Sequence, residues 1–150
     1  MSGKKFFISD QAKKISSSLI IISGISRSGT TFMGKILGSM KNIEYIYEPP
    51  TLLMLFNIIN KIDKETWINL FETYIYEEFL INSLSGRYLN FNKNDDSYIY
   101  NTKERNEIIS RLKLSPRKFK IEKLAGKFRV LIKIPDISVS LKKFREYFPD

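Results

Sequence analysis

The hydrophobic positions of the chain follow two kinds of spacing. Residues 18–23 and 128–135 are short, nearly continuous apolar runs rich in β-branched side chains, which is typical of strands buried on both faces of a parallel sheet. Residues 43–47 predict a further short strand, which Pro49 and Pro50 end. Elsewhere the apolar residues recur every three or four positions, as they do on one face of a helix. Strands separated by helices predict an α/β fold with a parallel sheet.

Helical spacing covers several segments, which are 30–40, the two halves of 52–84, 103–112 and 138–147. The first helix carries an apolar stripe, as a helix packed on a core does, and the stripe consists of Phe32, Met33, Ile36, Leu37 and Met40. Asp63 suits the N-terminus of a helix and divides the long helical stretch in two. The polar residues 90–97 and the basic segment 117–127 are expected to form loops.

The composition limits both the size of the fold and its chemistry. A chain of 150 residues that is 43% hydrophobic suits a single domain, 1–150, with residues 1–17 as an N-terminal extension. The chain contains no Cys and no His, which excludes disulfides, thiolate ligands, Ser-His or Cys-His catalysis and almost every zinc site. Proton transfer must therefore use a carboxylate, a lysine or a tyrosine, and no metal site is expected.

The net charge and the hydrophobic runs also limit which classes of partner and which cellular location are expected. A formal charge of +9 favours acidic partners such as nucleotides and sulfated or phosphorylated compounds. The basic residues are dispersed and accompany no base-stacking module, so nucleic acid is not an expected partner. Polar residues interrupt any signal-peptide core near the N-terminus, and the apolar run 19–22 is far too short to span a bilayer. We expect a cytoplasmic protein with no transmembrane segment.

The strongest local motif lies between the first predicted strand and the first predicted helix, where residues 20–37 read IIISGISRSGTTFMGKIL. Glycines let the main chain approach an anion closely, and the backbone N–H groups at the start of a helix bind phosphate. Gly24 and Gly29 meet this requirement, although a turn that is merely rich in Gly and Ser is the plainer alternative. Thr30 stands where nucleoside triphosphatases carry the loop lysine that binds the terminal phosphates.

The loop sequence GISRSGTT resembles the 5′-phosphosulfate loop of sulfotransferases that use 3′-phosphoadenosine 5′-phosphosulfate. The resemblance implies a P-loop NTPase-like three-layer fold and a loop that binds the 5′-phosphate and the sulfuryl group of this co-substrate without a metal. It also implies that Arg27 contacts the transferring sulfuryl group. The remaining loop contacts would come from Ser28, Gly29, Thr30 and Thr31.

Glu48 follows the second predicted strand in the sequence YIYEPP, seventeen positions after Thr31. This spacing resembles the branch of the family that uses a carboxylate as the base, such as the tyrosylprotein and several carbohydrate sulfotransferases. The resemblance implies that Glu48 deprotonates the acceptor hydroxyl, a role that commonly accelerates a reaction about a hundredfold or more. The competing interpretation is an ordinary solvated residue at the end of a strand.

Lys133 belongs to the segment VLIKIPDISVSLKKFREYFPD, which resembles the part of the family where a strand ends in Lys-x-Pro and a helix leads to a Phe-Pro-Asp turn. Lys133 would then lie at the carboxyl end of a parallel strand, where α/β sheets bind ligands. The resemblance implies that it neutralises charge on the sulfuryl and bridging oxygens. A lysine whose ammonium group simply reaches solvent is the alternative.

The resemblance covers residues 19–150 and corresponds to the N-terminal part of a sulfotransferase domain. After the Phe-Pro-Asp turn the family continues with a strand and an element that holds the 3′-phosphate, and this sequence has no matching residues. We therefore expect a domain that is incomplete at its C-terminus and leaves a sheet edge open.

The implied activity is transfer of a sulfuryl group to a hydroxyl of a saccharide, a glycolipid or a tyrosine. Two loops, 90–97 and 117–127, are expected to cover the acceptor together with the aromatic residues Trp67, Phe71, Tyr74 and Tyr76. Aromatic residues at helical spacing nevertheless belong to a core more often. Two other classes stay open, namely a P-loop nucleotide-binding kinase or NTPase and a truncated remnant without catalytic activity.

Overall fold

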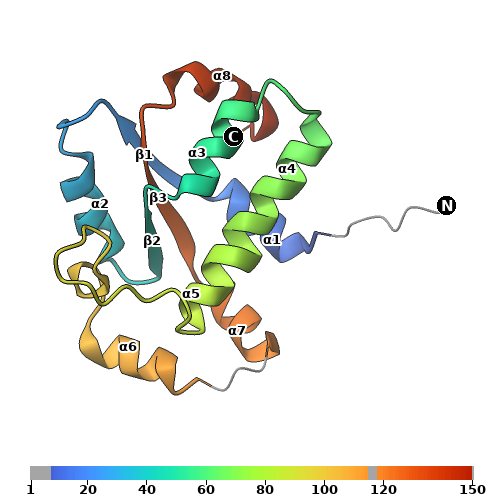
Figure 1. The fold of residues 1–150 in the computed structure, drawn as a ribbon. Coiled ribbons are helices and arrows are strands. Elements are labelled where there is room, and N and C mark those ends of the chain that lie inside the picture. The colour runs from blue at the N-terminus through green and yellow to red at the C-terminus, as the bar shows by residue number, and fades with distance from the viewer. Residues whose placement is uncertain (1–7, 115–117, 150) are drawn as a thin grey trace.

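A parallel sheet forms the centre of the computed structural model, which describes residues 8–114 and 118–149. Its strands are β1 (Ile20–Gly24), β2 (Ile43–Tyr47) and β3 (Arg129–Pro135), and they lie side by side in the order β1-β3-β2 (Figure 1). Both pairs are parallel, so the three carboxyl ends meet at one edge of the sheet. The predicted α/β class and all three strands are confirmed. Within the described residues β1 pairs with β3 alone.

The helices between and around the strands are α1 (Asp10–Ser17), α2 (Thr30–Gly38), α3 (Pro50–Ile58), α4 (Lys64–Thr73), α5 (Asn82–Leu84), α6 (Arg105–Leu112), α7 (Lys118–Ala125) and α8 (Ser138–Tyr147). A π-helix, η1 (Tyr74–Ile81), joins α4 to α5, and a short 3-10 helix, η2 (Ile99–Asn101), precedes α6. The side chain of Asp63 accepts a hydrogen bond from the N–H of Thr66 at 2.9 Å, which confirms it as the cap that begins α4. No described helix has the length and apolar character needed to cross a bilayer.

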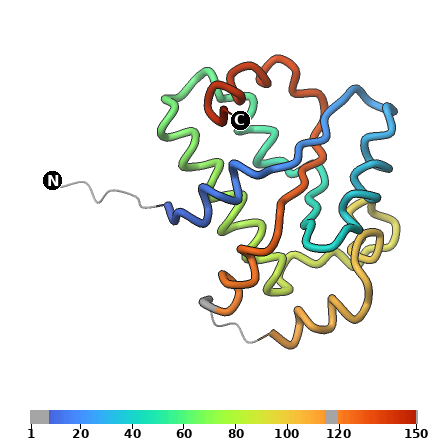
Figure 2. Tube along the Cα trace, turned by 180° about the vertical axis from the view of Figure 1, so that it is seen from behind, coloured from blue at the N-terminus to red at the C-terminus, as the bar shows by residue number. Residues whose placement is uncertain are grey.

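The helices cover both faces of the sheet. On one side α2 packs on the sheet, and on the other α1, α3 and α4 surround the main core (Figures 1 and 2). Alternate residues of the central strand face this core, namely Val130, Ile132 and Ile134, while Leu131 and Lys133 face α2. The N-terminal helix α1 was not predicted from the sequence, and its buried Ala12 and Ile15 make it part of the core.

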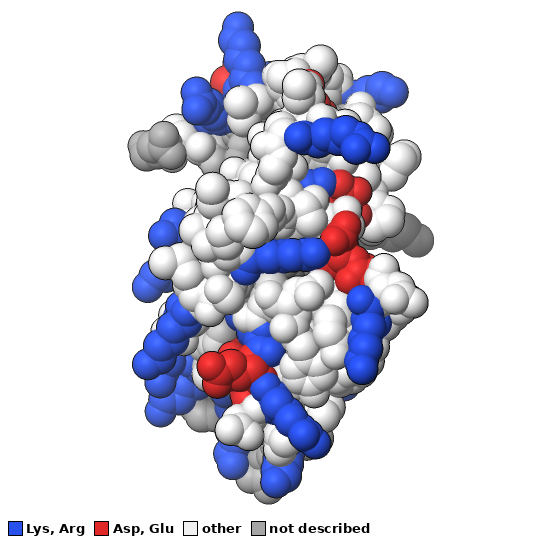
Figure 3. Space-filling view, turned by 90° about the vertical axis from the view of Figure 1, so that its left-hand side faces the viewer, with Lys and Arg blue, Asp and Glu red and all other residues white. Residues whose placement is uncertain are grey.

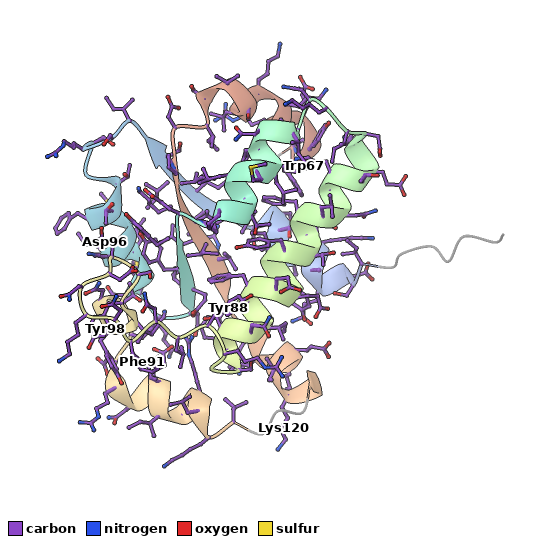
Figure 4. All side chains as sticks on the ribbon, viewed as in Figure 1. Trp67, Tyr88, Phe91, Asp96, Tyr98 and Lys120 are labelled. Atoms are coloured by element: carbon purple, nitrogen blue, oxygen red, sulfur yellow. The ribbon has the colours of Figure 1, made fainter. Side chains whose placement is uncertain are left out.

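An aromatic cluster fills the space between α3, α4 and α8. Trp67 is fully buried and stacks on Phe71 with ring centroids 4.9 Å apart, and its Nε1 donates a hydrogen bond to the carbonyl of Leu55 at 2.7 Å (Figure 4). Tyr76 is also buried, whereas Tyr74 is only half-buried. Trp67, Phe71 and Tyr76 therefore belong to the core and do not cover a ligand.

The helix α2 differs from the prediction in the face that it buries. Gly34 and Gly38 are the buried positions, and both lie directly against the side chain of Tyr45 on β2. Most of the apolar stripe points outward instead, and the exposed residues are Phe32, Met33, Ile36 and Met40. The expectation that this stripe packs on the core is wrong, because the close approach of helix and strand needs residues without side chains at the contact.

The segment 117–127 was expected to be a loop, but α7 occupies most of it. The side chains of Ile121 and Ala125 recur at a spacing of four residues and are both buried. The many lysines hid this short apolar stripe, because they occupy the solvent face of the same helix. Arg117 lies outside the described residues.

A buried ion cluster fastens α6 to the start of β2. Arg111 donates to both carboxylate oxygens of Glu44, at 2.9 and 2.8 Å, and the hydroxyl of Ser83 also donates to this carboxylate. Lys103 donates to the carbonyl groups of Gly38 and Ile43. These contacts hold the segment 85–104 over the outer edge of β2.

Candidate functional site

A cavity of about 890 Å³ opens at the carboxyl ends of the three strands. Its wall consists of the loop after β1, the first turn of α2, and the ends of β2 and β3. Ligands of open α/β sheets bind at this edge, and the volume lies in the usual range of about 300–1,000 Å³ for small-molecule sites. The cavity is therefore large enough for a nucleotide.

The loop between β1 and α2 is shaped by its two glycines. A Cβ atom on Gly24 would lie 2.9 Å from the hydroxyl oxygen of Ser28, which leaves no room for a side chain there. Gly29 caps α2 with a φ of 80°, a left-handed conformation that glycine adopts without strain. The backbone N–H groups of Thr30 and Thr31 then point out of the first turn toward the cavity edge, where a helix attracts anions.

Arg27 lies in this loop and lines the cavity with an exposed side chain. Its φ of 64° is in the left-handed region, which costs a residue other than glycine on the order of 1 kcal/mol. Among the described residues only Asn42 and Glu48 share this property. Two of these three strained residues, Arg27 and Glu48, therefore line the same cavity, and such strain is often concentrated at functional sites.

Glu48 reaches the cavity because its backbone breaks the alternation of β2. An extended strand would send Tyr47 and Glu48 to opposite faces, but the φ of 40° at Glu48 brings both side chains to the cavity. The N–H of Glu48 donates to the carbonyl of Lys133 at 2.8 Å, which fixes this bend against β3. Without the bend the carboxylate would not face the loop after β1.

The carboxylate of Glu48 forms an ion pair with the ammonium group of Lys133. Lys133 is buried, and its Nζ atom lies 5.0 Å from the centre of the Tyr47 ring. Burial and the nearby Glu48 raise the pKa of the Tyr47 hydroxyl, so this group is neutral near pH 7 and available as a hydrogen-bond donor.

Sequence reasoning missed a further charged pair at the edge of the site. Lys35 lies one helical turn beyond Thr31 and lines the cavity, and its Nζ donates to Asp96 at 2.7 Å. This hydrogen bond holds the pKa of Asp96 below its usual range. Spacing along α2 could have indicated Lys35, but no local signal could have placed Asp96, which comes from the distant loop 90–97.

The structure thus brings most of the predicted site residues together. Arg27, Gly29, Thr30, Thr31, Glu48 and Lys133 line one cavity. Ser28, which is exposed, is not among the residues that line the cavity. The cavity combines cationic groups, the first turn of a helix and two carboxylates, those of Glu48 and Asp136, so it is suited to binding an anion and accepting a proton. The described residues hold no group of three or more Asp or Glu side chains that could bind a metal.

The surface around α2 carries basic side chains that are spread along the face, with smaller acidic groups between them (Figure 3). Such a distribution attracts small anions without forming the continuous basic stripe of a nucleic-acid interface. The chain matches no protein-family model, no curated protein and no solved structure. The fold and site alone therefore define the class, which is an α/β protein with a cavity at the carboxyl edge of a parallel sheet.

Proposed function

We propose that the protein is a sulfotransferase with a P-loop NTPase-like fold that uses 3′-phosphoadenosine 5′-phosphosulfate as sulfuryl donor. One observation carries the proposal. Arg27, Glu48 and Lys133 are far apart in sequence, but all three line one cavity beside the glycine turn. The motif alone accounts for an anion site. The ion pair of a carboxylate with a buried lysine next to that site adds the means to move a proton.

In this proposal the first turn of α2 binds the 5′-phosphate of the donor, and Arg27 neutralises the sulfuryl oxygens. Glu48 takes the proton of the acceptor hydroxyl while the hydroxyl oxygen forms a bond to sulfur. The bond between sulfur and the phosphate oxygen breaks, and its electron pair stays on the phosphate, where Lys133 neutralises the new charge. Atoms and charges balance without a metal ion.

Before the donor binds, the contact between Lys133 and Glu48 prepares Glu48 for its proposed role as base and Lys133 for its role in neutralising charge. A carboxylate that pairs with an ammonium group is ionised, which is the state that a general base requires. When the donor binds, its sulfuryl oxygens compete for the ammonium group of Lys133. The carboxylate of Glu48 then loses a partner at the point where the acceptor hydroxyl must be deprotonated.

A second candidate is metal-dependent phosphoryl transfer, as in a kinase or NTPase, and Asp136 at the end of β3 favours it. This residue lines the cavity, and a carboxylate beside the phosphate loop holds magnesium in such enzymes. The carboxylate of Asp136, however, already accepts a hydrogen bond from the N–H of Ser138 at 2.8 Å. Thr30 also replaces the loop lysine that binds the terminal phosphates.

Isothermal titration calorimetry with 3′-phosphoadenosine 5′-phosphate, the desulfated donor, tests the proposal. We expect binding that does not require magnesium, and we expect Arg27→Ala to weaken it by about tenfold to a hundredfold, the value of a charge-assisted hydrogen bond. Arg145→Ala on α8 is the matched control, because this arginine is exposed and does not line the cavity. Equal affinity of the Arg27 variant and the parent would remove Arg27 from the site. Tighter, magnesium-dependent binding of ATP would favour phosphoryl transfer, and no binding would favour a silent remnant.

A further inference from the structure

A second, smaller cavity of about 190 Å³ adjoins the first along β2. Its floor is β2, one wall is the beginning of η1 with Tyr74, and the other is the segment 88–102. In Figure 4, Asp96 and Tyr98 lie on the α2 side of this segment, while Tyr88 lies near the end of α5. The volume is below the range of about 300–1,000 Å³ for drug-sized ligands, so the cavity suits one ring-sized group.

The lining combines flat aromatic rings with short polar groups. Several tyrosine rings face the cavity, those of Tyr45, Tyr47, Tyr74, Tyr88 and Tyr98. Asn90, Asp96 and Ser97 add amide, carboxylate and hydroxyl groups to the same wall. A sugar ring has apolar C–H faces that stack on aromatic rings and an edge of hydroxyl groups that bond to such polar atoms. The lining therefore matches a sugar ring in both respects.

The segment that carries these groups is held in place by its own hydrogen bonds. Asn90 donates from its side chain to the hydroxyl of Ser97 at 2.6 Å, and its carbonyl accepts from the N–H of Ile99 at 2.8 Å. Asp95 accepts from the N–H of Ser97 at 2.7 Å. The wall is thus a closed loop with fixed geometry, and a ligand would meet groups that are already positioned.

The two cavities share Tyr47 as their common wall. The Tyr47 hydroxyl donates to Asp96 at 3.3 Å, and Lys35 of the larger cavity donates to the same carboxylate at 2.7 Å. Glu48, the proposed base, directly follows Tyr47 in the chain. Glu48 lines the larger cavity, so a hydroxyl of a group bound in the smaller cavity must extend past Tyr47 to reach its carboxylate.

The charge of the smaller cavity separates a neutral sugar from an acidic acceptor. Of the described residues that line it, Asp96 and Glu44 are charged, and each is already paired with a cation outside the cavity, Asp96 with Lys35 and Glu44 with Arg111. No lysine or arginine among the described residues lines the cavity, so it offers no free cation to a sulfated or uronic acid sugar or to an acidic tyrosine peptide, whereas its polar groups suit neutral hydroxyl groups. The exposed ring of Tyr88 offers a stacking surface at the mouth.

From this geometry we infer that the smaller cavity is the acceptor subsite and that it binds a neutral sugar ring. The inference rests on the proposed sulfuryl transfer, because the acceptor hydroxyl must meet the donor in the adjoining cavity. Tyr88 and Tyr98 stack on the ring, Asn90 and Asp96 accept or donate hydrogen bonds at its edge, and the reacting hydroxyl extends past Tyr47 into the donor cavity.

The test compares acceptors and variants while monitoring the donor separately. The whole protein is incubated with radiolabelled donor on an array of immobilised neutral glycans and, in parallel, with a tyrosine peptide. We expect label on neutral glycans. For the best glycan we expect Tyr88→Ala to raise KM about tenfold with little change in kcat, because a lost aromatic contact is worth up to about one factor of ten. Phe91→Ala is the matched control, since Phe91 is as exposed on the same segment and does not line the cavity.

Calorimetry with the desulfated donor separates failure of the subsite from failure of the proposed function. The subsite is overturned if the donor binds and label goes only to the tyrosine peptide or to nothing, or if Tyr88→Ala leaves the KM for glycan unchanged. If the donor does not bind, the proposed function fails, and the array is then read for binding of the protein itself. Glycan binding that Tyr88→Ala abolishes would still support a sugar site, and its absence would reject it.

Discussion

At the scale of single residues, the proposed function depends on one bend in the backbone. Glu48 adopts a φ of 40° immediately before Pro49, a position where the chain is already restricted, and this conformation turns its carboxylate toward Lys133. Glu48 and Arg27 both have strained backbones and both face one cavity, although no connection along the chain forces them together. The proposed roles of Arg27 and Glu48 would account for such costs at both positions.

The substitution Glu48→Gln tests the role of this carboxylate. The amide keeps the shape of the side chain and still accepts a hydrogen bond from Lys133, but it cannot take a proton. We therefore expect the calorimetric affinity for the desulfated donor to change less than about twofold, and turnover to fall at least about a hundredfold. Glu104→Gln, an exposed carboxylate outside the cavity, should leave both unchanged. Near-normal turnover of Glu48→Gln would reject this residue as the base.

The sequence predicted those site residues that lie in or next to a local motif. Arg27 belongs to the glycine loop, and Glu48 and Lys133 were predicted from motifs that resemble the sulfotransferase family, with the strand-end position of Lys133 as added support. All three line one cavity. Asp96 could not be predicted, since it reaches the site only after α4, η1 and α5 have turned the chain back over β2. Tyr47 was hidden by the alternation rule, which assigns adjacent strand residues to opposite faces.

At the scale of elements, α2 shows why an apolar pattern can mislead. Its apolar residues suggested a buried stripe, but the side of α2 that touches β2 consists of glycines. Close packing of a helix on a bulky residue such as Tyr45 requires small partners. The pattern gave the position of the helix correctly and its orientation wrongly, because periodicity reports hydrophobicity and not the distance between backbones.

The substitution Gly34→Ala tests this packing. A Cβ atom at Gly34 would lie 2.5 Å from the hydroxyl oxygen of Tyr45 and 2.7 Å from its Cζ atom, so helix or ring must move. Overpacking costs about 1–3 kcal/mol, and the higher helix propensity of Ala returns up to about 1 kcal/mol. We expect a net loss in the free energy of unfolding, measured by urea denaturation. In a Tyr45→Ala background the same substitution should be neutral or stabilising, and an equal loss there would contradict the packing argument.

The long rod formed by α4, η1 and α5 illustrates the limit of element prediction. Asp63 indicated where the rod begins, because a cap is a local signal. The π-helical turns from Tyr74 to Ile81 carry no such signal, yet they place Tyr74 on the smaller cavity while Ile75 and Tyr76 stay buried. Packing against the core, and not helix propensity, selects this register.

At the scale of the whole molecule, the site depends on how the distant segment 85–104 is held against the sheet. The sheet supplies Glu48 and Lys133, but the wall of the acceptor subsite comes from this segment. It is fastened at its far end by the ion cluster of Glu44, Lys103 and Arg111. The cluster is buried, and desolvation lowers the pKa of Lys103. Removing one of these charged groups therefore leaves another buried charge without its partner.

The substitution Arg111→Met tests the coupling of this segment to the fold. Methionine fills much of the volume but leaves the carboxylate of Glu44 buried with only the hydroxyl of Ser83 and the more distant Lys103, 3.8 Å away. Breaking a buried ion pair costs about 3–5 kcal/mol, so we expect a loss of this size in urea denaturation. Arg105→Met on the exposed face of α6 is the matched control and should change stability by less than about 0.5 kcal/mol.

A double variant distinguishes a buried charge from lost packing as the cause. If the unpaired carboxylate is responsible, Glu44→Gln combined with Arg111→Met should recover much of the loss, because position 44 is then neutral and Lys103 keeps its hydrogen bonds to the carbonyls of Gly38 and Ile43. If the loss persists in full, the packing of the Arg111 side chain decides the stability. One such contact is the guanidinium group, which lies 5.9 Å from the centre of the Phe128 ring. Only the first result would mean that electrostatic pairing, formed over a sequence separation of 67 residues, holds the wall of the acceptor subsite to the catalytic sheet.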